Sequence, residues 1–423
     1  MQIYGIILMM LGSKGILPPT NAMDCIILHL YKMEVQKMTE GKDLLQVLWS
    51  GADVLRGKMD ANEYKTYLLG LVFYKYLSDS YLSKAYDLMN DEKPDSLEEA
   101  QECYEEVMES EDAKDLLEEL KESLHYTLDS DMTYVSMLKS AKNNSFNREK
   151  LQAAFNRIQE SDQLFNGLFA DVDLYSNRLG TGDQKQSATI AEVIKVLEGA
   201  DLIHAKGDVL GNAYEYLIGQ FASETGKKAG EFYTPHEVSL LMSEIVASHL
   251  QGKNEIKIYD PTSGSGSLLI NIGHSAAKYM SDANNIKYYA QELKESTYNL
   301  TRMNLVMRGI KPDNIVTRNG DTLEEDWPYF DENDPVNSYD PLYVDAVVSN
   351  PPYSQAWDPS NKEADPRYAR FGLAPKGKAD YAFLLHDLFH VKPDGIMTIV
   401  LPHGVLFRGG EEGEIRKNLI ESN

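Results

Sequence analysis

The chain is poor in cysteine: Cys25 and Cys103 are the only two among its 423 residues. Two thiols cannot build a disulfide framework or a zinc site made of cysteines, and we expect no metal centre. A reducing, cytoplasmic setting is the simple interpretation. With 43% hydrophobic and 25% charged residues, the sequence is otherwise that of a globular protein long enough for two or three domains.

Basic charge is also scarce, because 41 Lys and Arg stand against 66 Asp and Glu, for a net charge of −25. At first sight this argues against a nucleic-acid partner. The acid is uneven, however: residues 91–120 carry fourteen acidic side chains and only two lysines, Lys93 and Lys114. We interpret this block as a solvated helical face or a surface kept away from DNA, and plain solubility explains it equally well. A DNA partner would require another subunit to supply much of the positive charge.

No apolar run is long enough to span a membrane. The apolar N-terminus, Met1 to Leu11, falls far short of the roughly 20 residues that a bilayer requires, and no Lys or Arg precedes it. Neither a signal peptide nor an anchor fits, and no membrane contact is expected. Met33 and Met38 are each sensible starts, so we expect residues 1–37 to be an upstream extension without function.

The remaining chain divides by its hydrophobic period. Residues 38–205 have apolar residues at helical spacing and are predicted to form a helical domain. Residues 206–423 alternate short apolar strands with helices, which predicts a doubly wound α/β domain with a parallel sheet. The helices expected in and just after the first domain are 64–82, 96–124, 145–160, 190–197 and 208–221. The expected strands are 256–259, 288–291, 315–318, 343–348 and 396–400.

Ligands of such sheets bind beyond the carboxyl ends of the strands. The first strand is followed by Asp260-Pro-Thr-Ser-Gly-Ser-Gly266, in which Gly264 and Gly266 permit close approach of a ligand to the backbone. The helix that follows offers free N–H groups. A plain turn also favours Gly and Ser, and Leu269 stands where a dinucleotide fingerprint requires Gly or Ala. The loop therefore indicates a nucleotide-like ligand that is not a dinucleotide.

Acidic residues end the next two strands. Glu292 can accept both ribose hydroxyls of an adenosine; alternatively it is a surface glutamate. Asp321 can accept from an adenine amino group, although a turn or helix-cap role competes strongly.

The fourth strand runs into Asn350-Pro351-Pro352-Tyr353. Two prolines end the strand, so its last side chains face a cleft. An amide, a rigid turn and an aromatic ring at a strand edge suit the capture of a flat, amine-bearing base, whereas an ordinary Pro-rich turn is the alternative. Upstream, Thr234-Pro235 indicates a helix start.

The order and spacing of these motifs resemble an S-adenosylmethionine-dependent amino methyltransferase. More narrowly, the chain resembles the modification (M) subunit of type I restriction–modification systems, an N6-adenine DNA methyltransferase with a Rossmann-like catalytic domain. The likeness runs from about Leu45 to the end. The stretches that carry it are residues 207–218, 230–235 and 401–408 together with the motifs above.

The resemblance implies residue roles. S-adenosyl-L-methionine would be the cofactor, and the residues expected to bind it are Glu231, Phe232, Tyr233, Thr234, Pro235, Asp260, Ser263, Gly264, Ser265, Gly266, Glu292 and Asp321. The target adenine would be flipped from the duplex. Asn350 oxygen and Pro351 carbonyl would accept its two N6–H bonds, Pro352 would keep the turn rigid, and Tyr353 would stack on the base.

The resemblance also implies partners: double-stranded DNA, a specificity (S) subunit, a second M subunit and, in some complexes, the endonuclease (R) subunit. The motifs leave no room for a domain that reads DNA sequence, which agrees with a separate specificity subunit. The polar segment 354–378, with Arg367, Arg370, Lys376 and Lys378, is interpreted either as a lid that touches phosphates or as a surface loop.

Two alternatives stay open. Asn-Pro-Pro-Tyr also occurs in enzymes that methylate glutamine side chains of proteins. The chain moreover ends soon after the fifth strand, where this fold usually continues through two more strands. The second alternative is therefore an inactive structural fragment, whose catalytic domain is incomplete and whose sheet has an unpaired edge.

Overall fold

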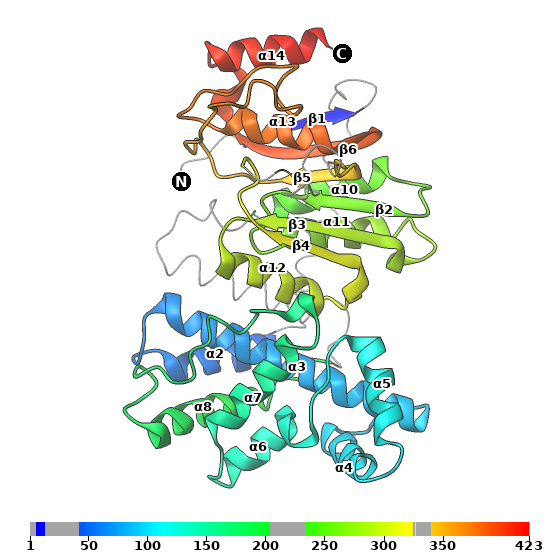
Figure 1. Ribbon diagram of the computed structural model, residues 1–423, viewed down its shortest axis with the longest axis vertical. Coiled ribbons are helices and arrows are strands. Elements are labelled where there is room, and N and C mark those ends of the chain that lie inside the picture. The colour runs from blue at the N-terminus through cyan, green and yellow to red at the C-terminus, as the bar shows by residue number, and fades with distance from the viewer. Residues whose placement is uncertain are drawn as a thin grey trace. The chain divides into compact units, whose positions relative to one another are not determined.

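The structure is a computed structural model that describes residues 6–12, 42–203, 234, 236–324, 326 and 340–422 (Figure 1). Its contacts divide the chain into two compact units, and each is described by itself. One, the helical unit, comprises residues 31–226 and 302–312; the other, the sheet unit, comprises residues 1–30, 227–301 and 313–423. The expected boundary at 205–206 and the expected helix 208–221 lie outside the described residues. None of the described helices is long and apolar enough to cross a bilayer.

The helical unit is built around α3, Ala61–Asn90. A capping box between Asp60 and Glu63 begins this helix. Aromatic side chains fill the core beside it, with Phe155 stacked on Phe169 at 4.1 Å between ring centroids. The other helices are α2 Lys42–Leu55, α4 Leu97–Met108, α5 Ala113–Leu124, α6 Tyr134–Lys142, α7 Arg148–Gln159 and α8 Asp183–Leu197.

The single helix expected over 96–124 is wrong, because α4 and α5 are separate. Ser110 breaks the helix: its hydroxyl donates to the Val107 carbonyl and accepts from the Asp112 N–H. Such local bonds compete with helical ones. The acidic side chains of the 91–120 block lie mostly on the exposed faces of these two helices, as a solvated helical face requires.

The sheet unit contains six strands in the order β1-β6-β5-β2-β3-β4 (Figure 1). All neighbours are parallel except β1, which is antiparallel to β6. The strands are β1 Ile6–Gly12, β2 Ile256–Asp260, β3 Ile286–Glu292, β4 Ile315–Asn319, β5 Val344–Ser349 and β6 Val391–Pro402. The five predicted strands are all present, and the predicted parallel α/β fold is confirmed.

Helices cover the sheet. Tyr259, Val347 and Met397 are neighbours in register across β2, β5 and β6, and they share one core cluster with residues of α13, Asp380–His390. Side chains alternate along a strand, so the residues between them face the opposite layer. The remaining helices of this unit are α10 His236–His249, α11 Ser267–Ala277, α12 Glu295–Met307, whose last turns belong to the helical unit, and α14 Glu411–Glu421.

The outer edge of β6 is paired. Residues Ile6 to Gly12 run antiparallel along it, from Ile6 opposite Pro402 to Gly12 opposite Ile396. The expectation of a bare edge is therefore wrong for this structure. An apolar segment of seven residues satisfies the backbone groups that an edge strand leaves open.

Candidate functional site

A pocket of about 430 Å³ opens at the carboxyl ends of β2 and β5. The strand order reverses between these two strands, because the chain proceeds outward to β3 and β4 on one side and to β6 on the other. Such a reversal leaves a crevice in which open α/β sheets bind ligands. The pocket is lined by Thr234, Asp260, Pro261, Thr262, Ser263, Gly264, Ser265, Ser267, Leu268, Glu292, Leu293, Lys294, Thr297, Asp321, Thr322, Asn350, Pro352, Tyr353, Gln355 and Phe383.

The loop after β2 forms the floor of the pocket. Gly264 and Gly266 both have positive φ, at 57° and 80°, which favours glycine. At Gly266 a side chain would also meet the Thr301 methyl at 3.3 Å. The Thr301 hydroxyl donates to the Gly264 carbonyl at 2.7 Å. The glycines therefore allow a tight turn that α12 holds from below.

Asp260 is 1% exposed and holds the start of this loop. Its Oδ1 accepts from the Thr262 N–H at 2.9 Å, whereas its Oδ2 and the Thr262 hydroxyl have no hydrogen-bond partner. Burial raises the pKa of Asp260 to about 8; the hydrogen bond from the Thr262 N–H opposes this rise, and the nearby Glu292 charge adds to it. Unsatisfied buried polar atoms in a pocket wall are suited to a polar ligand.

Glu292 lies at the end of β3, and backbone groups fix its carboxylate. Oε2 accepts from the Gly264 N–H and Oε1 from the Lys294 N–H, both at 3.0 Å. Burial raises the pKa of Glu292, and these hydrogen bonds partly offset the effect. Two held oxygens with remaining lone pairs can accept from a pair of neighbouring hydroxyls.

Asp321 follows β4 and also lines the pocket. Its Oδ1 accepts from the Leu323 N–H at 2.9 Å, which is the turn role that competed with ligand binding in the sequence analysis. The neighbouring Thr322 hydroxyl donates to the Pro261 carbonyl and ties this turn to the loop after β2.

Asn350 directly follows β5, on the other side of the reversal in strand order between β2 and β5. Its Nδ2 donates to the Thr234 hydroxyl at 3.1 Å, and its Oδ1 accepts from the Tyr353 hydroxyl at 2.9 Å. Thr234 is buried, at 7% exposure, whereas Tyr353 is 42% exposed. The partner of the amide oxygen is thus a half-exposed hydroxyl at the mouth of the pocket.

An ion pair between the buried Asp380 and the partly buried Arg408 supports the turn. Ser354 has a positive φ of 52°, and its N–H donates to the Asp380 carboxylate at 2.7 Å. Arg408 Nη2 in turn donates to Asp380 at 2.5 Å. Residues of α13 and of the segment after β6 therefore hold the end of the Asn350–Tyr353 turn.

The structure gathers most of the predicted site residues in this pocket. Gly266 and Pro351 are next to lining residues but do not line the pocket, and Glu231, Phe232, Tyr233 and Pro235 lie outside the described residues. Sequence reasoning missed Leu293, Lys294, Thr297 and Phe383 as lining residues. Leu293 and Lys294 directly follow Glu292, a signal that could have been used; Phe383 on α13 carries no such signal.

The segment 354–378 is an ordered loop with its own core. Trp357 N–H donates to the Lys376 carbonyl, and Trp357 and Tyr368 are buried against each other at 5.4 Å between ring centroids. Lys376 and Arg370 are exposed, as phosphate contacts require, but Arg367 is 3% exposed. The expected phosphate contact of Arg367 is therefore wrong: its guanidinium is occupied inside the protein.

Two consecutive parts of the sequence each match a family model. Residues 205–423 match the N-6 DNA Methylase family, and residues 44–197 match the HsdM N-terminal domain. The type I restriction enzyme MpnII methylase subunit of Mycoplasma pneumoniae is 31% identical over 411 residues, which are 92% of this chain and 73% of that protein. The MjaIX methylase subunit of Methanocaldococcus jannaschii is 27% identical over 89% of this chain and 64% of its own.

Comparisons of the fold agree. The type I restriction–modification methyltransferase subunit from Streptococcus thermophilus is 46% identical, with a TM-score of 0.81 over 90% of this chain and 79% of that one. A modification subunit of a type I restriction enzyme from Vibrio vulnificus shares the fold with a TM-score of 0.55, at 15% identity over 90% of this chain and 75% of its own. The chain belongs to the N-6 DNA methylase family, as a methyltransferase (M) subunit of the type I restriction–modification kind.

Proposed function

We propose that this chain transfers a methyl group from S-adenosyl-L-methionine to N6 of a flipped adenine in double-stranded DNA. It would do so as the modification subunit of a complex with a separate specificity subunit, a second modification subunit and, for restriction, an endonuclease subunit. The observation that carries the proposal is that Asp260, Glu292 and Asn350 line the same pocket. With DNA as its substrate, the protein would act in the cytoplasm.

The β2–β3 side of the pocket fits the cofactor. The unpartnered Asp260 Oδ2 and Thr262 Oγ1 are suited to polar atoms of its amino-acid end, and the Gly264–Gly266 turn leaves room beside the backbone. Glu292 would accept the ribose hydroxyls, and Asp321 would accept from the adenine amino group with the oxygen that the Leu323 N–H leaves free. When bound, the cofactor supplies a methyl group on a positively charged sulfur, which is already an activated leaving group.

The β5 side fits the target base. Asn350 Oδ1 and the Pro351 carbonyl would accept the two N6–H bonds, which orients the amine and raises the electron density on nitrogen. Thr234 would keep the amide from turning over, and Tyr353 would leave Asn350 to stack on the flipped ring. Positioning then contributes most of the rate acceleration, so no strong general base is needed.

The discriminating experiment is methyl transfer from radiolabelled S-adenosylmethionine. The chain, with and without a specificity subunit, is incubated with unmethylated duplex DNA or with a protein substrate, and products are identified by mass spectrometry. We expect N6-methyladenine in DNA, abolished by Asn350→Ala. Labelled glutamine would favour the protein-methylating alternative, and N4-methylcytosine would overturn the choice of base. Absence of cofactor binding by calorimetry, alone and with the specificity subunit, would favour the inactive fragment.

A further inference from the structure

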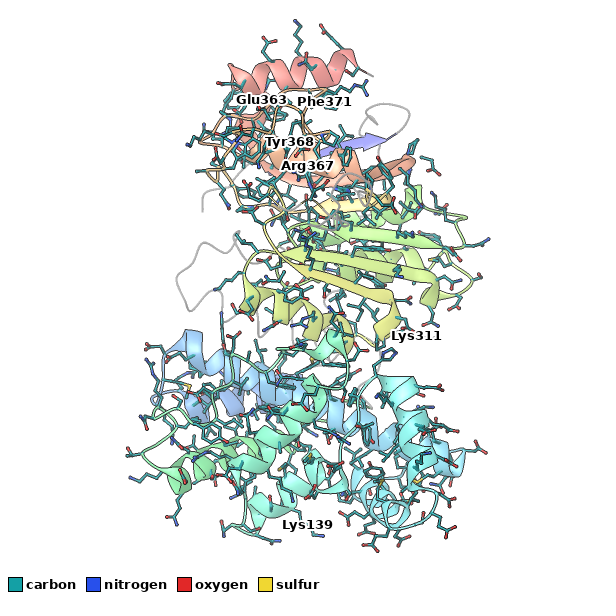
Figure 2. The ribbon with its side chains drawn as sticks, viewed as in Figure 1. Lys139, Lys311, Glu363, Arg367, Tyr368 and Phe371 are labelled. Carbon is teal, nitrogen blue, oxygen red and sulfur yellow. The ribbon has the colours of Figure 1, made fainter. Side chains whose placement is uncertain are left out.

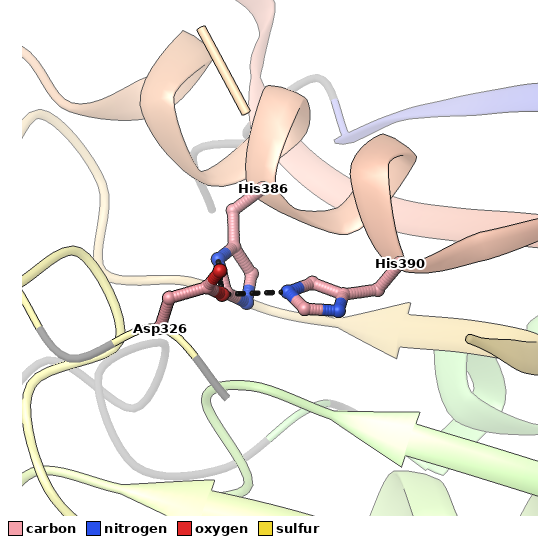
Figure 3. A group of neighbouring side chains, drawn as sticks. All are labelled: Asp326, His386 and His390. Atoms are coloured by element: carbon pink, nitrogen blue, oxygen red, sulfur yellow. Dashed lines mark hydrogen bonds and ion pairs between the residues drawn. The ribbon is translucent and has the colours of Figure 1, made fainter. Parts of the chain in front are cut away.

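Asp326, His386 and His390 form a cluster in which both imidazoles are buried and the carboxylate is partly buried (Figure 3). His390 Nε2 lies 2.9 Å from Asp326 Oδ1, and His386 Nδ1 lies 3.9 Å from the same oxygen. A carboxylate and two imidazoles are residue types that can together bind a metal ion at such distances. The surroundings of His386 decide against it.

Arg367 occupies the place that a cation would take. Its Nη1 lies 3.1 Å from His386 Nδ1 and 3.9 Å from Asp326 Oδ1. A guanidinium can only donate hydrogen bonds, so His386 Nδ1 must accept. A metal ion would therefore compete with Arg367 both for the lone pair of His386 and for the negative charge of Asp326.

This donor fixes the direction of a longer chain of hydrogen bonds. Because Nδ1 accepts, the proton of the neutral His386 ring is on Nε2, which donates to the Tyr259 hydroxyl at 3.1 Å. Tyr259 donates to Gln291 Oε1 at 3.1 Å, and Gln291 Nε2 approaches the Gly320 carbonyl at 3.5 Å. Burial lowers the pKa of His386 well below its ordinary value, which agrees with a neutral ring. Each donor in the chain meets an acceptor.

This hydrogen-bond chain runs through residues that directly precede three of the predicted cofactor residues. Tyr259 precedes Asp260, Gln291 precedes Glu292, and Gly320 precedes Asp321. Tyr259, Gln291 and His386 are fully buried. Neighbouring residues of a strand point to opposite faces. The chain therefore ties together the backs of the three strand ends whose next residues border the pocket.

At its other end, the chain is held by the segment 354–378. Arg367 donates to both oxygens of Asp365, and it also donates to the Thr322 carbonyl at 2.9 Å and the Leu323 carbonyl at 3.2 Å. Arg367 lies across the ring of Tyr368, 5.0 Å from its centroid, in the loop's own core (Figure 2). The fork of Arg367 thus binds the loop to the turn after β4 as well as to His386.

We propose that Arg367 is a positioning residue for cofactor binding, which couples the segment 354–378 to the carboxyl ends of β2, β3 and β4 through His386, Tyr259 and Gln291. This inference rests on the proposed function, because it takes the pocket as the S-adenosylmethionine site. Coupling of this kind is reciprocal: a loop that steadies the pocket is itself steadied when the pocket is filled. Order in the segment next to the target base is thereby linked to the presence of the methyl donor.

The test measures cofactor affinity by calorimetry on the whole chain with its specificity subunit. Tyr259→Phe removes one hydroxyl from the middle of the hydrogen-bond chain and keeps the packed ring. Arg367→Met removes the guanidinium at which the hydrogen-bond chain starts. Each variant is expected to weaken S-adenosylmethionine binding about tenfold. The double variant should weaken it no further, since both substitutions break the same hydrogen-bond chain. Glu363→Gln, on the same segment but exposed, is the control and should bind S-adenosylmethionine as the unmodified protein does.

Two more measurements separate coupling from plain loss of stability. A purely structural role would lower the unfolding temperature of the ligand-free variants and leave the affinity of the folded protein unchanged. Hydrogen exchange of residues 354–378 should slow on adding the cofactor to the unmodified chain but not to Tyr259→Phe. Unchanged affinity of Tyr259→Phe, additive effects in the double variant, or equal slowing in Tyr259→Phe would each overturn the inference alone. No binding by the unmodified chain would overturn the proposed function with it.

Discussion

Asn350 Nδ2 donates to Thr234 Oγ1 at 3.1 Å, across 116 residues of sequence. This bond turns the other end of the amide, the Oδ1 atom, towards Tyr353 and the pocket. Thr234, two residues before α10, thus sets the orientation of the Asn350 side chain after β5. Thr234 was expected on the cofactor side of the site, whereas in the structure its hydroxyl lies against the Asn350 amide.

Replacing Thr234 by Val should slow methyl transfer, because the isosteric side chain cannot accept from Asn350 Nδ2. Loss of one such hydrogen bond corresponds to a fall of about tenfold in kcat, while the dissociation constant of S-adenosylmethionine stays unchanged. Thr234→Ser keeps the hydroxyl and is the control. A Val variant with the rate of the unmodified chain would show that Asn350 needs no external support.

The two functions of Tyr353 can be separated. Tyr353→Phe keeps the ring and frees Asn350 Oδ1, so methylation should proceed at least as fast as in the unmodified chain. Tyr353→Ala loses stacking on the flipped base, which is worth about 1–3 kcal/mol. Fluorescence of DNA with 2-aminopurine at the target position reports the extruded base. Equal loss of signal in both variants would point to the hydroxyl instead of the ring.

Asp260 should make the ligand-free protein less stable as the pH rises. Its folded-state pKa of about 8 lies above its ordinary value of 3.8, so the folded state holds the proton more tightly than the unfolded state. The resulting stabilisation is complete at low pH and is lost as the pH rises from about 4 through about 8. Urea unfolding of the unmodified chain and of Asp260→Asn, across this range, should give a steeper decline for the unmodified chain. Parallel pH profiles would contradict the assignment.

Lys376 and Lys378 are expected to contact DNA phosphates. Changing both to Gln should reduce the slope of log K against log salt concentration by about two units, measured by fluorescence anisotropy on duplex DNA. Lys278→Gln is the control. Lys278 follows the last residue of α11, whereas the first residue of that helix, Ser267, lines the pocket. Slopes that do not differ from that control would remove the two lysines from the interface.

The helical unit contains a buried ion pair whose disruption should be costly. Lys75 Nζ lies 2.5 Å from Asp79 Oδ2; both residues belong to α3, and both side chains are buried. Lys75→Met would leave a buried carboxylate without its partner, which costs about 3–5 kcal/mol of unfolding free energy. Replacing Asp79 by Leu in the same chain should recover much of this loss. A double variant as unstable as Lys75→Met would mean that packing, not charge, governs this position.

Much of the sheet unit could be predicted, because local patterns there have tertiary meaning. Each predicted apolar run with a turn signal after it became a strand of the parallel sheet. Two of the fold predictions failed, one because of local side-chain bonds and one because of a distant partner. The break between α4 and α5 depends on side-chain bonds of Ser110, and the partner of the β6 edge comes from the other end of the chain.

Arg367 illustrates the same limit. A basic residue in a polar loop reads as a phosphate contact, and nothing near it in sequence indicates otherwise. Only the fold brings His386, Asp326 and the turn after β4 around its guanidinium. Burial of a charge depends on partners that lie elsewhere in the chain, so a local pattern cannot reveal it.

By itself, the sequence determined the fold class, the family and the residues at the strand ends, because strand period, turn chemistry and motif order are local properties of the chain. The tertiary structure alone decided which of these residues share one pocket, that Thr234 orients Asn350, and that Arg367 faces inward. These facts are contacts between segments far apart in sequence. They exist only once the parallel strands have brought their carboxyl ends to the same edge of the sheet.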